Sequence, residues 1–315
     1  MKILSLSGFI PEQIVDTVRF TQYNGQQSIS HYCGYAADYI SQVLEDVSID
    51  GAVFPRSCDS TRVIPDYLSD CNKFSYQLNV PARQDQPAID FFSNCIKCYK
   101  ESVENHYGII LNQINERVQL VNARNRNLAQ LYQNISEFSY ADYLTGIHSM
   151  LLQPLDKQGS LSIKSSVCKS VKKKRVYIVG SFLSNIEVVS TIENTGLNIV
   201  GDNLTESKRL FSAPSVSTIG DVYNNISESI LHNRLSPTQN NFREIIQSDL
   251  DEIKCKKVEG VIFVTQKYCE PYDYLFAVYK KFLDDNNIPF IHIKLTDSTD
   301  NKKSAFAIEA FAEIL

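Results

Sequence analysis

The chain has 315 residues, of which 43% are hydrophobic and 21% are charged, and its formal net charge is −5. This length allows two domains of ordinary size with a sizeable core, and the acidic balance argues against a general nucleic-acid-binding protein. No run of about 18 uncharged apolar residues predicts a membrane span, and the N-terminus lacks the pattern of a signal peptide. We therefore expect a cytoplasmic globular protein, bound neither to a membrane nor to nucleic acid. Its eight cysteines are expected to stay reduced, and some of them can bind metal.

The first segment has the pattern βαβαβ. Pro11 suits the first turn of a helix and Glu12 its positive end, so a helix is expected to begin there. A second helix has apolar residues at helical spacing. Strands are predicted at residues 3–6, 52–54 and 74–80, and helices at 11–15 and 35–44.

The middle of the chain changes character. Apolar residues recur at helical spacing from about residue 88 to residue 152, without proline or glycine between Gly108 and Gly146. We expect two or three packed helices, the longest beginning near Leu111. Residues 153–174, rich in Ser, Lys and Gln, predict an exposed connection.

The last segment alternates apolar strands with helical stretches, which predicts a parallel sheet covered on both faces. Its strands are expected at residues 176–179, 197–200, 261–264 and 290–293. The residues after them should share one edge of the sheet, namely 180–181, 201–202, 266–270 and Asp297. The predicted fold is therefore α/β, with two Rossmann-like parallel-sheet domains and a helical insert. The expected boundaries are 1–87 for the N-terminal α/β domain, 88–152 for the helical segment, 153–174 for the linker and 175–315 for the C-terminal α/β domain.

Three cysteines lie where strands of such a fold should end. Cys58 and Cys269 each follow a short apolar run that glycine introduces, and Cys33 lies before a predicted helix. Ligands of open α/β sheets collect beyond the carboxyl ends of the strands, so the three thiols can converge on a crevice between the domains. Three thiolates suit a soft metal, or an iron–sulfur cluster with one open coordination position. The competing interpretation is three small buried apolar side chains.

Other candidate groups carry weaker signals. Cys95 and Cys98 form a lone C-x2-C on a predicted helix, without a second pair or a βαβ redox context, so incidental residues are favoured over a metal or redox role. His31 can contact a substrate or a cluster sulfur, although a structural role is favoured. The remaining histidines form no zinc-binding pair. The chain has no GxSxG, P-loop or GxGxxG motif, which removes the usual support for acyl hydrolysis, ATP hydrolysis and nicotinamide binding.

A series of short motifs extends over essentially the whole chain: residues 8–14, 51–59 with Arg62, 115–126, 193–202 with Arg209, 260–263, 267–271, 288–290 and 309–311. In order and spacing, these motifs resemble the B-type (beta) subunits of the 2-hydroxyacyl-CoA dehydratase and benzoyl-CoA reductase superfamily. The match is closest around Cys269.

The resemblance implies a [4Fe-4S] cluster held by Cys33, Cys58 and Cys269 in the cleft between the domains. It also implies a second dehydratase-like subunit or a homodimer, an ATP-dependent iron–sulfur activator protein, and an acyl-CoA substrate. The implied reaction is a radical, reductively initiated dehydration of an (R)-2-hydroxyacyl-CoA to an enoyl-CoA, catalysed by an oxygen-sensitive lyase within a heteromer. The catalytic side chains are not identified by it.

Two alternatives remain open at this point. The chain could be a subunit of an acyl-CoA or benzoyl-CoA reductase, which consumes the electron instead of recycling it. It could also be a non-catalytic, cluster-bearing electron-relay partner. Residues 203–206 and 301–304 depart from the family pattern, which bears on substrate contacts and not on the cysteines.

Overall fold

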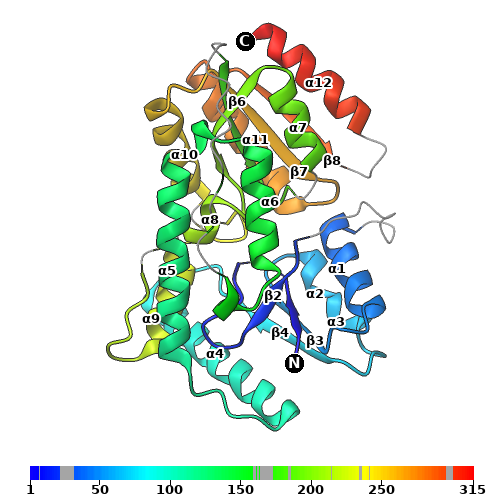
Figure 1. Ribbon diagram of the computed structural model, residues 1–315, viewed down its shortest axis with the longest axis vertical. Coiled ribbons are helices and arrows are strands. Elements are labelled where there is room, and N and C mark those ends of the chain that lie inside the picture. The colour runs from blue at the N-terminus through cyan, green and yellow to red at the C-terminus, as the bar shows by residue number, and fades with distance from the viewer. Residues whose placement is uncertain are drawn as a thin grey trace.

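The computed structural model contains two parallel β-sheets, placed one above the other along the long axis of the molecule (Figure 1). It describes residues 1–6, 8–21, 32–158, 161, 163, 173–183, 186–213, 215–233, 236–240, 242–295 and 301–315. The first sheet comprises β1 (Ile3–Ser5), β2 (Thr17–Arg19), β3 (Gly51–Arg56) and β4 (Phe74–Asn79). The second comprises β5 (Lys174–Gly180), β6 (Leu197–Asn203), β7 (Gly260–Gln266) and β8 (Phe290–Leu295).

The two sheets have the same topology. The strand order is β2-β1-β3-β4 in one and β6-β5-β7-β8 in the other, and all neighbouring strands are parallel. In both sheets the second strand in sequence lies on one side of the first and the third lies on the other. The strand order therefore reverses between β1 and β3, and again between β5 and β7. In open α/β sheets, ligands bind outside the carboxyl ends of the strands at such a reversal.

Helices pack against both faces of each sheet. The described helices are α1 (Gly34–Glu45), α2 (Asp59–Arg62), α3 (Ile64–Tyr67), α4 (Gln86–Tyr107), α5 (Ile114–Gln133), α6 (Tyr140–Leu151), α7 (Ile186–Asn194), α8 (Lys208–Phe211), α9 (Val222–Asn233), α10 (Phe242–Cys255), α11 (Glu270–Asp285) and α12 (Asn301–Ile314), with single 3-10 turns at Ile135–Glu137 and Leu155–Lys157.

The side chains of successive strand residues pack into hydrophobic cores on opposite faces of the sheet, as a sheet buried on both faces requires. In β3, Val53 packs with α4 and α9 on one face, whereas Ala52 and Phe54 pack with α1 and α3 on the other. In β5, Ile178 packs with α6, α7 and α12, whereas Tyr177 packs with α10 and α11. Both halves are therefore three-layered, and the predicted α/β fold with two Rossmann-like domains is confirmed.

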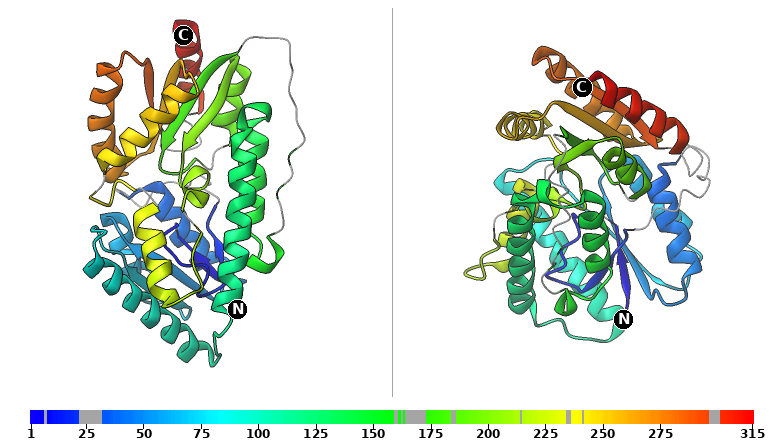
Figure 2. Two further views of the ribbon diagram at one scale, coloured as in Figure 1. Left: turned by 90° about the vertical axis from the view of Figure 1, so that its left-hand side faces the viewer. Right: turned by 45° about the horizontal axis from the view of Figure 1, so that its top comes forward.

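Helix α5 connects the two halves. Its first part contributes Val118 to the core of the first sheet, and its last part contributes Leu128 and Tyr132 to that of the second. Figure 2 shows α5 running along one side of the molecule past both sheets. In the opposite sense, α9 comes from the C-terminal half of the chain but packs against α4 beneath the first sheet. Helices α5 and α9 therefore hold the two halves of the molecule together.

A buried cluster of charges lies beside α5. Arg19 at the end of β2 and Arg124 of α5 both donate to the carboxylate of Glu12, each with a contact of 2.6 Å. Arg124 also donates to Gln158, at 2.8 Å. The exposed fractions of Glu12, Arg19 and Arg124 are 5%, 4% and 3%. This cluster ties the N-terminal strands to the long helix.

Some local predictions were wrong. Residues 11–15 form turns that lead into β2, a strand that the sequence pattern did not indicate. All five of these side chains are buried, so the segment has no solvent-facing side for an amphipathic helix. The longest helix is α4, which begins at Gln86 and not near Leu111.

Other predictions lie at the limit of what is described. Gly201 and Asp202 belong to β6 itself instead of following it, because β6 continues to Asn203. Asp297 and most of the predicted connection at residues 153–174 lie outside the described residues. Within the described part of that connection, Leu155–Lys157 form a 3-10 turn whose Leu155 is buried. None of the helices in the described ranges combines the length and the apolar character that crossing a membrane requires.

Candidate functional site

The carboxyl ends of the central strands of both sheets point to one cavity. Residues that follow β1, β3, β5, β6 and β7 all line it: Leu6, Gly8, Phe9, Ser57, Cys58, Ser181, Thr205, Arg209, Cys269, Pro271 and Tyr272. Cys33, at the start of α1, also lines this cavity. The two points at which the strand order reverses therefore face the same space between the sheets. All three predicted cysteines, Cys33, Cys58 and Cys269, meet there.

Cys58 is held by the short turn that follows β3. It is the N-cap residue of α2, and the hydroxyl oxygen of Thr61 accepts hydrogen bonds from the backbone N–H groups of Ser57 (3.2 Å) and Cys58 (3.1 Å). The Cys58 sulfur lies 3.6 Å from the same hydroxyl. The backbone N–H of Cys33 donates to the hydroxyl of Ser60 at 3.4 Å, which ties the two cysteine segments together.

Cys269 lies at the N-terminus of a long helix. It is the N-cap residue of α11, with Pro271 in the first turn and the Glu270 and Asp273 carboxylates at the positive end of the helix. Tyr268, just before it, has a left-handed backbone (φ 64°), which is unfavourable for a bulky residue. The turn between β7 and α11 is therefore held in a strained conformation that places Cys269 at the cavity.

The environment of the three thiols acts on their charge in opposite directions. Cys33 and Cys269 are N-cap residues of helices of 12 and 16 residues, and positive helix ends stabilise thiolates. The Cys269 thiol donates a hydrogen bond to Cys33, which lowers the pKa of Cys33 and raises that of Cys269 well above its ordinary value. Burial raises the pKa of Cys58. Three thiolates at such close quarters repel one another, so all three can ionise together only with a positively charged centre among them.

Two pockets meet at the three cysteines. The inner cavity, of about 130 Å³, extends from them between the two sheets past Phe9 and Arg209. The outer pocket, of about 310 Å³, extends from the same cysteines toward Tyr32 and Tyr268. Both are lined by Cys33, Cys58 and Cys269. The thiols thus form the boundary between an inner space and an outer one.

The three thiols are compatible with the two metal chemistries that the sequence suggests, a single soft ion and an iron–sulfur cluster. Within the described residues, no three His, Cys, Asp or Glu side chains are arranged to hold one metal ion. Three thiols from three segments line a shared cavity, with no fourth cysteine among its described lining residues. This donor set leaves one coordination position open, as an iron–sulfur cluster with three protein ligands requires.

The sequence was then compared with known proteins. A profile of the family "2-hydroxyglutaryl-CoA dehydratase, D-component" matches residues 25–315. The chain belongs to this family.

Two characterised relatives agree with this assignment. The chain is 26% identical over 156 residues to the (R)-phenyllactyl-CoA dehydratase beta subunit of Clostridium sporogenes, an alignment that covers 49% of this chain and 41% of that protein. It is 23% identical over 273 residues to a subunit of the benzoyl-CoA reductase of Thauera aromatica, covering 80% of this chain and 70% of that protein. The match to the dehydratase relative thus spans less than half of that relative's length. The resemblance inferred from the motifs is confirmed.

The other predicted groups of this dehydratase-family chain lie elsewhere. Cys95 and Cys98 are on α4, half-buried and exposed respectively, and neither lines the inner cavity or the outer pocket. Cys71 and Cys255 are also away from both. His31 and Cys168 fall outside the described residues.

One buried acid near the site was missed by the sequence reasoning. Glu206 follows β6, next to Thr205 of the cavity wall, and burial raises its pKa to about 8. Its Oε1 accepts from the backbone N–H of Leu183 at 2.5 Å, while its Oε2 is buried without a hydrogen-bond partner in the described structure. No motif marks this residue, because its burial depends on how the two halves pack.

Proposed function

We propose that this chain is the iron–sulfur subunit of a 2-hydroxyacyl-CoA dehydratase, with a [4Fe-4S] cluster held by Cys33, Cys58 and Cys269. The observation that supports this most directly is the meeting of these three thiols at one cavity, at the equivalent edges of two sheets with one topology. When bound, the cluster supplies one-electron chemistry and Lewis acidity.

The residues of the chain itself then have three tasks. The helix N-termini at Cys33 and Cys269 stabilise the negative charge of the sulfur ligands. The apolar wall around Phe9 and Pro271 excludes water from the inner cavity, where the reacting part of an acyl-CoA would bind. The thiols at the boundary leave the outer pocket as the side from which an electron can arrive. Both relatives are named as subunits, which supports a second subunit or a second copy as the partner. An ATP-dependent iron–sulfur activator as the electron donor is the further part of this proposal that the family resemblance implies.

A reductase component is the second candidate. The alignment to the benzoyl-CoA reductase relative covers 80% of this chain, against 49% for the dehydratase beta subunit. The two reactions differ in the fate of the electron, since a dehydratase returns it after each turnover. Turnovers per electron delivered, measured with (R)-phenyllactyl-CoA and with benzoyl-CoA, separate them. Many turnovers per electron support the dehydratase, and consumption in proportion to product supports the reductase.

The cluster is tested by iron and acid-labile sulfide analysis of anaerobically purified protein. About four iron and four sulfide per chain are expected, and Cys33→Ser, Cys58→Ser and Cys269→Ser should each lose most of them. Cys95→Ser and Cys98→Ser are matched controls, since they make the same chemical change on α4. A wild type that remains free of iron after anaerobic reconstitution, or equal losses in the control variants, would refute the assignment.

A further inference from the structure

The inner cavity has a single charged side chain in its described lining besides the cysteines, and that is Arg209. It lies on α8, just after β6, and is 6% exposed. The cavity wall around it is largely apolar or carries hydroxyl groups. A guanidinium remains protonated even in such a place, although burial lowers the pKa of Arg209. A buried positive charge is costly unless something negative compensates it.

Within the described residues, Arg209 has no direct ion pair with a carboxylate. Its Nε donates to the side-chain oxygen of Asn203 at 2.6 Å, and its Nη2 donates to the backbone oxygens of Asn203 (2.9 Å) and Gly180 (3.2 Å). Every one of these acceptors is neutral. The nearest link to a carboxylate runs through Asn203, whose amide donates to Asp249 at 2.7 Å.

The third nitrogen of the guanidinium, Nη1, lies toward the thiols. Its Nη1 donates to the hydroxyl of Tyr272, and the guanidinium carbon lies 5.3 Å from the centre of that ring. Tyr272 stands in the first turn of α11, where its backbone N–H donates to the carbonyl of Cys269. An arginine has five N–H donors, and the four contacts above leave one donor on Nη1 of this cavity-lining residue.

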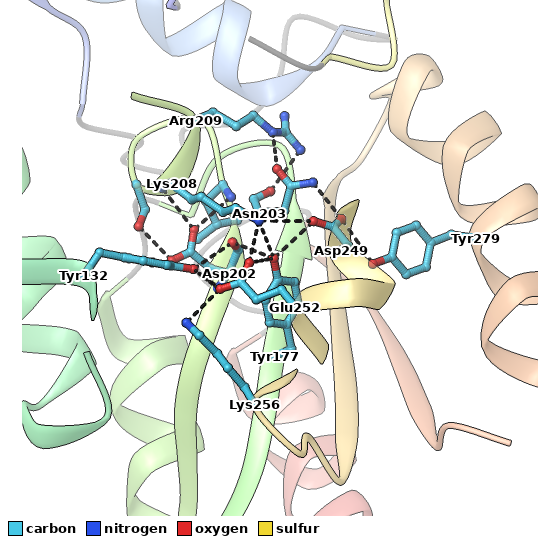
Figure 3. Close-up of polar contacts among 12 residues, drawn as sticks. Tyr132, Tyr177, Asp202, Asn203, Lys208, Arg209, Asp249, Glu252, Lys256 and Tyr279 are labelled. Carbon is cyan, nitrogen blue, oxygen red and sulfur yellow. Dashed lines mark hydrogen bonds and ion pairs between the residues drawn. The ribbon is translucent and has the colours of Figure 1, made fainter. Parts of the chain in front are cut away.

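Figure 3 shows how this orientation is maintained: Asn203 lies between Arg209 and Asp249, and Asp249 also accepts from the hydroxyls of Tyr177 and Tyr279. Lys208 points away from Arg209, toward Asp249 and Glu252. Asp249 and Glu252 are ion-paired with Lys208, and Asp249 also attracts the charge of Arg209 without contacting it. The guanidinium of Arg209 lines the cavity without a carboxylate in contact among the described residues.

We propose that Arg209 is the anion-binding group of the inner cavity and contacts the oxygen of the bound acyl group on which negative charge resides or develops, while Asn203 and Asp249 are positioning residues that fix its guanidinium. This inference rests on the proposed function for its substrate class, but the anion site itself does not require a cluster. A charge-assisted hydrogen bond of this kind discriminates a charged oxygen from a neutral one by about tenfold or more.

The test compares two ligands of one shape, (R)-phenyllactate and its neutral amide, by calorimetry on the full chain, both with its cluster and metal-free. Wild-type protein should bind the carboxylate at least about tenfold more tightly than the amide. Arg209→Gln should abolish that preference, and Arg209→Lys should retain most of it. Asn203→Leu should reduce the preference for the carboxylate without changing the iron content of the protein. A variant that only destabilised the fold would not lower this preference selectively.

Arg62→Gln is the matched control, because it removes the same charge close to Cys58 from a side chain that is 58% exposed and outside the inner cavity. It should leave the preference unchanged. Equal binding of carboxylate and amide by wild-type protein, or no measurable binding of the carboxylate at millimolar concentration, would overturn the proposal even if Arg209→Gln did not fold. Tighter binding of inorganic phosphate than of the carboxylate would overturn the assignment to the acyl group.

The two proposals fail separately in this design. A wild type that stays metal-free after reconstitution but still prefers the carboxylate refutes the cluster and retains the anion site. A protein with a full cluster and no preference retains the cluster and refutes the role of Arg209.

Discussion

Replacing Glu12 by Gln tests whether the buried charges beside α5 stabilise the fold. The change keeps the shape of the side chain but removes the negative charge that compensates Arg19 and Arg124. Both guanidinium groups would then remain buried beside each other without a carboxylate in contact. Breaking a buried ion pair by removing one partner costs about 3–5 kcal/mol, because an uncompensated charge is left inside the protein.

The expected shift in melting temperature follows from the size of the chain. An unfolding entropy of about 2.1 cal/mol/K per residue gives about 0.7 kcal/mol/K for 315 residues. A loss of about 3–5 kcal/mol therefore lowers the melting temperature by about 5–8 °C. Thermal unfolding followed by circular dichroism at pH 7, on metal-free protein, measures this shift without interference from a cluster.

Arg62→Gln provides the comparison, because its ion pair with Asp59 is exposed and should contribute about 0–1 kcal/mol. We expect it to lower the melting temperature by less than about 2 °C. If Glu12→Gln cost no more than this control, the two arginines would be compensated by other groups, and the reasoning would be refuted.

Three further predictions concern pH and packing. Glu206, whose pKa is raised to about 8, keeps its proton in the folded protein but loses it above about pH 4.5 in the unfolded chain, so the free energy of unfolding should fall as pH rises from about 4.5 to 8. In urea titrations, Glu206→Gln should flatten this part of the pH–stability curve, and an unchanged slope would contradict the raised pKa. Burial lowers the pKa of His148 to about 4, so this side chain is neutral in the folded protein and stability should fall as pH drops from about 6.5 to 4. His148→Phe should remove this loss of stability in thermal melts at pH 5, and an identical loss in the variant would contradict the lowered pKa. Gly180→Ala places a methyl group inside the van der Waals distance of the carbonyl oxygen of Val264 on the neighbouring strand and should cost about 1–3 kcal/mol in chemical denaturation; full stability of the variant would show that β5 and β7 can move apart.

The success of the fold prediction has a local cause. The strands β3, β5 and β7 are short apolar runs that begin or end with glycine, and both of their faces are buried, so the sequence pattern and the structure agree. The helix predicted at residues 11–15 does not form because of contacts with residues farther along the chain. Pro11 and Glu12 are compatible with a helix start, but Glu12 is required as the partner of two arginines, and these contacts decide the local conformation.

The sequence by itself predicted the α/β class, the family and the meeting of the three cysteines at one cavity, because each prediction is built from short motifs whose own residues are close along the chain. Only the tertiary structure decided that Arg209 lines the cavity and Glu206 is buried next to its wall, that α9 packs beneath the first sheet, and that Arg124 meets Glu12. The last of these contacts joins residues that are 112 positions apart. Such contacts depend on how two separately patterned sheets pack against each other, and periodicity carries no information about that packing.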